Sequence, residues 1–162
     1  MFYAINTVFS IRADLDTVLG VALVPHYPPK HHARAARILE TVLKIHPTNN
    51  EARFARAQIY ETAGQWSDAR QHFEKIVQNG GSEKERLDSK EEVGWCLANE
   101  GKLEEGRDIL EEVIEVRDTK AEKEKEAEAR ERGRTWWRLG RTEWMIGGKS
   151  RGPRKTLFQQ GL

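Results

Sequence analysis

The chain has 162 residues, of which 38% are hydrophobic and 33% are charged, against roughly 25% charged in an average globular domain. Its 27 basic and 26 acidic residues nearly cancel, which removes the electrostatic support for a uniform nucleic-acid binder. The single cysteine, Cys96, excludes an internal disulfide framework and a multi-thiolate zinc site. This composition favours a helical bundle or solenoid with a thin core.

The N-terminal segment, residues 1–13, is apolar as far as Ile11, and its first positive charge is Arg12. A secretory signal has its charge before the apolar stretch, so the order here is wrong for one. The sequence also lacks the run of about 20 apolar residues that a membrane span needs. We therefore expect a cytoplasmic or nuclear protein without a membrane partner.

Residues 14–49 form the first expected repeat unit. A helix is predicted over 16–24, with Leu19 and Gly20 at packing positions, and an enlarged proline-rich connection follows it. A second helix is predicted from apolar residues that recur at intervals of three and four. These residues are Ala35, Ile38, Leu39, Val42 and Leu43.

Two further units, residues 50–81 and 82–117, each read as a pair of helices. The predicted helices cover 50–63 and 67–78 in one unit, and 87–100 and 103–116 in the other. Each pair has a short turn with a glycine, Gly64 or Gly101, which suits the left-handed conformation that closes a helix.

The last part of the chain departs from this pattern. Residues 118–133 are rich in balanced charges and predict a solvated helical insert. Residues 134–148 predict the first helix of an incomplete fourth unit, over 136–146, with Gly147 and Gly148 as its turn. Residues 149–162 predict an irregular tail. The second helix of the fourth unit is missing, so we expect a piece of a longer array or an end that docks on a partner.

The repeated helix pairs resemble the tetratricopeptide repeat family, whose 34-residue signature is W-x2-L-G-x2-Y, then A-x3-F, then P. The residues that carry the resemblance are Ala35, Leu39, Pro47, Tyr60, Gly64, Ala69, Phe73, Gly94, Gly101, Trp136, Leu139 and Gly140. The resemblance implies an all-α helix-turn-helix solenoid, wound as a right-handed superhelix of about three and a half repeats, that binds other proteins.

Three residues depart from the signature. Arg53 and Arg56 stand where it has Trp and Leu, so we expect that helix to be held mainly by Ala57 and Tyr60. Gly106 replaces the usual alanine, which costs roughly 1 kcal/mol of helix propensity.

Aromatic residues predict a partner-binding groove. Trp137, Arg141 and Trp144 are spaced at i, i+4 and i+7 on the face of the helix opposite Trp136 and Leu139. Trp95 and Phe54 occupy comparable positions in their units. Because aromatic residues and arginine are enriched at interface hot spots, these five residues are candidates to bind a peptide or a partner helix. The alternative is that they pack on neighbouring helices of a longer array.

No set of residues predicts catalysis, a cofactor or a metal. The Gly148-Lys149-Ser150 sequence resembles the end of a phosphate-binding loop, but Glu143 stands where that motif needs glycine. The histidines in the proline-rich connection have no carboxylate or thiolate beside them, so a surface loop is the favoured reading of His26, His31 and His32. Cys96 has no activating neighbour and is expected to be buried.

Two stretches, residues 91–118 and 134–148, resemble the large tetratricopeptide scaffold subunit of the superkiller complex in its fungal form. That resemblance implies partners, namely an RNA helicase and WD-repeat subunits, and a role in 3′-to-5′ decay of messenger RNA with the exosome. RNA would be contacted only through the complex. The alternative is a co-chaperone or another peptide-binding adaptor, for which an acidic C-terminal peptide that binds through Arg141 would be diagnostic.

Overall fold

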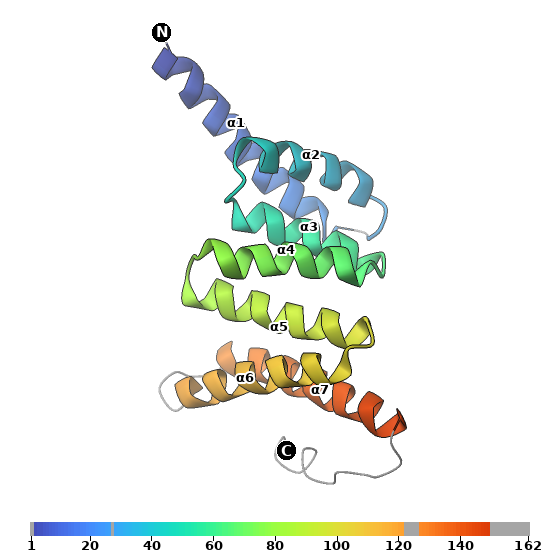
Figure 1. Ribbon diagram of the computed structural model, residues 1–162. Helices are drawn as coiled ribbons and strands as arrows, with labels where there is room; N and C mark the ends of the chain where they lie inside the picture. The colour runs from blue at the N-terminus through green and yellow to red at the C-terminus, as the bar shows by residue number, and fades with distance from the viewer. Residues whose placement is uncertain (1, 27, 122–126, 150–162) are drawn as a thin grey trace. The chain divides into compact units, whose positions relative to one another are not determined.

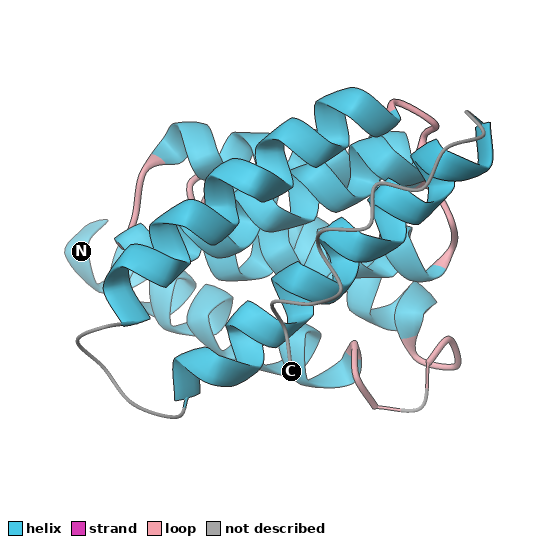
Figure 2. Cartoon of the chain, turned by 90° about the horizontal axis from the view of Figure 1, so that it is seen from below, coloured by secondary structure: helices cyan, strands magenta, loops and turns pink. Residues whose placement is uncertain are grey.

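The computed structural model describes residues 2–26, 28–121 and 127–149. Within those ranges every regular element is a helix, and none of these helices is long and apolar enough to cross a membrane (Figures 1 and 2). The helices are α1 (Phe2–Leu23), α2 (His32–Ile45), α3 (Asn50–Thr62), α4 (Trp66–Asn79), α5 (Glu83–Asn99), α6 (Leu103–Ala121) and α7 (Ala127–Lys149). The prediction of an all-α helix-turn-helix repeat fold is confirmed.

The chain divides into two units, Met1–Arg86 and Leu87–Leu162, with the division inside α5. In the first unit α1 packs on α2, α2 on α3, and α3 on α4, while α1 also contacts α3 (Figure 1). The core between α1, α2 and α3 consists of Val24, Ala35, Leu39, Val42, Ala52, Ala55 and Ile59. Gly20 is one reason that α1 and α2 approach closely, since a Cβ there would lie 2.7 Å from Leu39 Cδ2.

Glycines follow the ends of α3 and α5, and an asparagine caps the beginning of α3. Gly64 and Gly101 have φ values of +70° and +90°, a region that residues with a Cβ rarely adopt. The backbone N–H that follows each glycine reaches back to the last turn of the helix, to Tyr60 O (2.9 Å) and Leu97 O (3.0 Å). Asn49 caps α3 by accepting a hydrogen bond from the Ala52 N–H at 2.9 Å.

In the second unit, α6 and α7 pack along each other and enclose Leu110, Ile114 and Leu139. Helices α5 and α6 approach closely at Gly94 and Gly106. A Cβ on Gly106 would lie 2.7 Å from Gly94 O and 2.9 Å from the backbone nitrogen of Ala98. Gly106 therefore costs helix propensity but permits this contact between backbones.

The structure corrects three expected boundaries. Helix α1 begins at Phe2 and continues through residue 13, so no separate segment precedes the helix expected over 16–24. Gly147 and Gly148 lie inside α7 and form no turn. Much of the insert expected over 118–133 is the end of α6 and the beginning of α7, which itself starts before the 136–146 range expected for that helix. Residues 150–162 of the predicted tail lie outside the described residues.

Candidate protein-binding surface

Helix α7 exposes two tryptophans on one side. Trp137 is 62% exposed and Trp144 is 66% exposed, although large aromatic side chains are usually well buried. They lie seven residues apart, so both project from the same face of the helix. Arg141 is between them, and its Cζ lies 5.2 Å from the centre of the Trp144 ring, within the range of a cation–π interaction.

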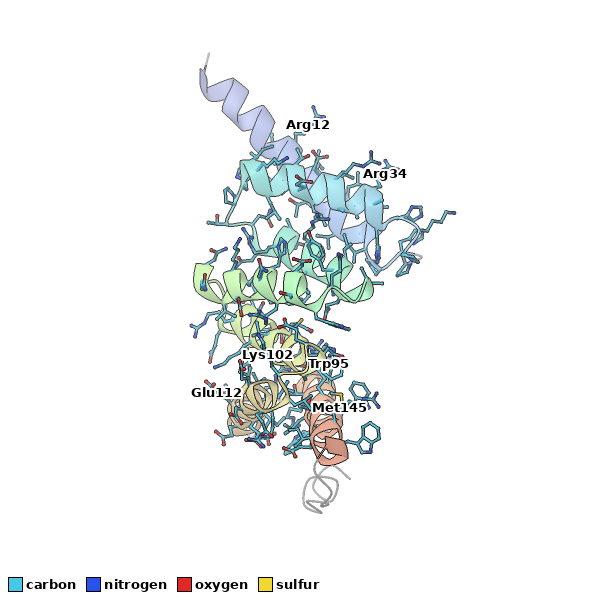
Figure 3. The ribbon with its side chains drawn as sticks, turned by 45° about the vertical axis from the view of Figure 1, so that its right-hand side comes forward. Arg12, Arg34, Trp95, Lys102, Glu112 and Met145 are labelled. Carbon is cyan, nitrogen blue, oxygen red and sulfur yellow. The ribbon has the colours of Figure 1, made fainter. Side chains whose placement is uncertain are left out.

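Trp95 of α5 extends this face toward a second helix. Its ring centre lies 5.7 Å from that of Trp137, and the Cζ of Arg138 lies 5.4 Å from the Trp95 ring. In Figure 3 the labelled Trp95 and Met145 come to one side of the second unit, while Glu112 lies on the other side. We call Trp95, Trp137, Arg141 and Trp144 the aromatic surface.

The opposite face of α7 holds the helix in place. Leu139 is 1% exposed, and Trp136 packs against the cluster that Leu139 forms with Leu110 and Ile114. The two adjacent tryptophans therefore have different environments, since Trp136 faces the core and Trp137 faces solvent. Because the inner face is packed, the outer face is presented on a fixed helix.

A buried carboxylate also fixes α7. Glu91 of α5 is fully buried and receives hydrogen bonds from Arg134 Nε at 2.9 Å, Arg138 Nη1 at 2.9 Å and Thr135 Oγ1 at 3.0 Å. Arg117 of α6 places its Nη2 2.9 Å from the same carboxylate. Burial opposes the charge on Arg134, but the hydrogen bonds that Arg134 donates to Glu91 outweigh it, and the pKa of Arg134 is raised. Three helices thus meet at one carboxylate.

Neighbouring acids extend the network. Arg117 Nη2 lies 2.7 Å from Asp88 and its Nη1 lies 3.4 Å from Glu131, while Arg138 Nη2 lies 2.8 Å from Glu92. Sequence reasoning missed this network and placed Glu131 and its neighbours in a solvated insert. The signal available was the position of Glu91 and Glu92 directly before the apolar run that begins at Val93, since a carboxylate at a core position needs cationic partners.

The other residues predicted for the groove or for packing lie as follows. Phe54 is half-buried in the first unit, where its ring meets the edge of Phe73 at 5.1 Å, so it is not part of the aromatic surface. The remaining residues of the predicted packing set divide by exposure. Ala35, Leu39, Ala69, Phe73 and Gly94 are buried, Tyr60 and Gly140 are half-buried, and Pro47, Gly64 and Gly101 are exposed.

The cysteine and the histidines that were considered as candidates for chemistry make contacts that hold the fold. Cys96 is fully buried, in agreement with the prediction. The rings of His26 and His31 stack at 5.7 Å, and His32 Nε2 lies 3.0 Å from Val24 O. Among the described residues no group of three or more histidine, cysteine or acidic side chains is arranged to hold a metal ion.

A second exposed apolar strip lies on α1 and consists of Ile11, Leu15, Val18 and Leu19, which are 41–66% exposed. The buried residues of that helix, Ala13, Thr17 and Gly20, face the other way. Arg12, whose side chain is 80% exposed, lies beside this strip, but the strip contains no tryptophan, in contrast to the aromatic surface.

A comparison with known protein families supports the repeat expected from the sequence. Residues 30–89, which run from α2 into α5, match the tetratricopeptide repeat family. No curated protein matches the chain. Tetratricopeptide repeats generally mediate contacts between proteins and are typically not enzymes, so the match supports a protein partner without naming one.

Proposed function

We propose that this chain is a non-enzymatic interaction scaffold whose protein partner docks on the aromatic surface of the second unit. The observation that carries the proposal is the pair of tryptophans, Trp137 and Trp144, left about two-thirds exposed on a helix held firmly from behind. A soluble monomer gains nothing in stability from such exposure, whereas a partner that covers the rings gains their burial.

The expected gain is large. A tryptophan buries roughly 150–250 Å² when fully covered, so about two-thirds of that area remains available on each ring. At about 25 cal/mol per Å², covering one ring stabilises a complex by roughly 2–4 kcal/mol before the cost of association. That is the magnitude of an interface hot spot.

The test is affinity purification of the tagged full chain, with each recovered protein identified by mass spectrometry. Replacing both Trp137 and Trp144 with alanine should remove the partner and leave the helical circular dichroism unchanged. The matched control is Ile45→Ala, which truncates a 48% exposed apolar side chain on α2. A partner that remains bound to the double variant would contradict the proposal.

The narrower proposal is a role as part of the superkiller scaffold subunit in cytosolic 3′-to-5′ messenger RNA decay. It is supported by the resemblance of residues 91–118 and 134–148, which include Trp95 and the α7 tryptophans. It predicts that an RNA helicase, WD-repeat subunits and exosome components are recovered with the chain. Their absence from a purification that does recover a partner would overturn it.

The alternative is a co-chaperone or another peptide-binding adaptor. Arg141 favours it, because this exposed guanidinium stacks on Trp144 and forms no ion pair within the described ranges. A carboxylate of a bound peptide would supply the missing counter-charge. Recovery of heat-shock chaperones, lost on Arg141→Ala, would support this alternative, and recovery that survives Arg141→Ala would contradict it.

A further inference from the structure

A group of basic side chains lies between α3 and α4 in the first unit and shares no residue with the aromatic surface. Arg53 and Arg56 are three residues apart on α3, and His72 and Lys75 are three residues apart on α4, so each pair shares a helix face. We call these four residues the cationic cluster.

Tyr60 joins the two helices at this point. Arg56 Nη2 donates a hydrogen bond to the Tyr60 hydroxyl at 3.1 Å, and the Arg56 Cζ lies 4.8 Å from the Tyr60 ring centre. The Tyr60 and His72 rings are 5.4 Å apart. Arg56 is therefore held above the ring that also touches His72, so its guanidinium and the imidazole belong to one site.

The cluster has few counter-charges, since Glu40 of α2 attracts Arg56 but is itself paired with Lys44 at 3.0 Å, and Asp68 is the acid that acts on His72. In the part of the chain that the structure describes, no carboxylate forms an ion pair with Arg53, Arg56 or Lys75, although Arg70 of the same α4 pairs with Glu74 at 2.5 Å. Arg53, Arg56 and Lys75 are each close enough to His72 to lower its pKa. An unpaired group of like charges is unfavourable in the folded state and favours the binding of an anion.

Arg53 strengthens the case for a bound anion, because this cation is buried. The residue is only 9% exposed, its Nη2 donates to Pro47 O, and its Nε has no acceptor among the described residues. Burial lowers the pKa of Arg53, as expected for a cation removed from water. A buried guanidinium without a carboxylate is costly, and a nearby anion would offset part of that cost.

The pKa of His72 responds to the same positive charges. The pKa of His72 is lowered to about 4, first by burial and then by the charges of Arg53, Arg56 and Lys75, while Asp68 opposes the shift. The imidazole is therefore neutral at pH 7. Because the surrounding cations add to the effect of burial, a bound anion that screens them would raise the pKa of His72.

We propose that the cationic cluster binds the phosphoryl group of a phosphorylated segment of a partner protein. Three permanent positive charges match a dianion better than a single carboxylate, and the planar guanidinium of Arg56 suits phosphate oxygens. A nucleic acid would need basic residues that extend over many phosphates, which a balanced chain with one small cluster does not offer. This site is independent of the proposed function, because it uses no residue of α7.

The test follows the C–H resonances of the His72 ring by NMR in the full chain. The probe is a phosphoserine pentapeptide with glycine and alanine on either side, compared with the same peptide containing serine or aspartate and with inorganic phosphate. We expect the phosphoserine peptide to raise the pKa of His72 by at least one unit, with the aspartate peptide weaker by tenfold or more and the serine peptide inactive.

Variants make the result specific. Arg56→Gln and Lys75→Gln should each weaken phosphoserine binding at least tenfold, while Arg34→Gln, which removes an exposed cation on α2, should leave it unchanged (Figure 3). Circular dichroism confirms that each variant folds. The proposal is overturned if the phosphoserine peptide leaves the pKa of His72 unchanged, if the aspartate peptide binds equally well, or if the Arg56→Gln variant binds normally. Inorganic phosphate that binds as tightly as the phosphoserine peptide would also overturn it, since that would indicate a small-anion site.

Discussion

Replacing Gly106 with alanine tests whether α5 and α6 depend on close contact between their backbones. By helix propensity alone the change should stabilise α6 by roughly 1 kcal/mol, since glycine is the poorer helix former. The structure predicts the opposite. The new Cβ would lie 2.7 Å from Gly94 O and 2.9 Å from the backbone nitrogen of Ala98, distances that require the helices to separate.

The magnitude follows from these contacts. Both atoms belong to backbone, so no side chain can rotate away, and separating the helices loosens the contacts of Gly94 with Ile109 and Leu110. Overpacking of this kind costs about 1–3 kcal/mol, and the cost at Gly106 should be at the upper end because helix axes must move. After the gain in propensity, we expect a net loss of about 1–2 kcal/mol.

Urea unfolding followed by circular dichroism measures this loss, with Gly133→Ala as the matched control. Gly133 lies inside α7, is exposed, and has nothing within 4 Å of its ideal Cβ position. The same substitution there should stabilise the chain by about 0.5–1 kcal/mol. If both substitutions stabilise the chain equally, the close approach of α5 and α6 is refuted.

Three further measurements examine charges and a helix cap. Glu91→Gln should lower the free energy of unfolding by about 3–5 kcal/mol, because it leaves buried arginines without their carboxylate. Glu112→Gln, which changes an exposed ion pair, should lower it by less than about 1 kcal/mol. Equal losses of stability in urea unfolding would contradict the network. The pKa of His72 is about 4 in the folded chain and about 6.5 in the unfolded chain, so the free energy of unfolding should fall as the pH drops from about 6.5 to 4. The loss should be at most roughly 3 kcal/mol, and about half that once solvent around the half-buried ring is allowed for. A His72→Gln variant with the same dependence of stability on pH would contradict this. Asn49→Ala should cost about 1 kcal/mol by loss of the α3 cap, and a thermal midpoint that does not change would argue against the cap.

The helix pairs could be predicted because their signals are local. Apolar spacing and turn glycines place α3 and α4 within a residue or two of their observed ends, and the burial of Cys96 follows from its apolar neighbours. The early start of α1 could not be read in this way. Its residues before Arg12 are apolar without a clear period, so no pattern distinguished a helix from an apolar segment.

The environments of the charged residues were harder to predict from the sequence. Composition could not separate Arg134, which pairs with the buried Glu91, from the solvated charges beside it, because the difference depends on which helix lies opposite. Arg53 was expected only to replace a packing residue, yet it is itself buried. The tryptophan spacing on α7 did indicate an exposed face, since a period of seven fixes a helix face without knowledge of the partner.

The central claim is that a partner protein covers the aromatic surface, and crosslinking tests it most directly. A photoreactive benzophenone amino acid placed at Arg141, in the full chain expressed in its own cells, should crosslink to a protein on irradiation. The same group placed at Ile45 should give no such product. A crosslink at Arg141 that disappears when Trp137 and Trp144 are replaced by alanine is the predicted result. Identical products from both positions, or none at Arg141, would contradict the account.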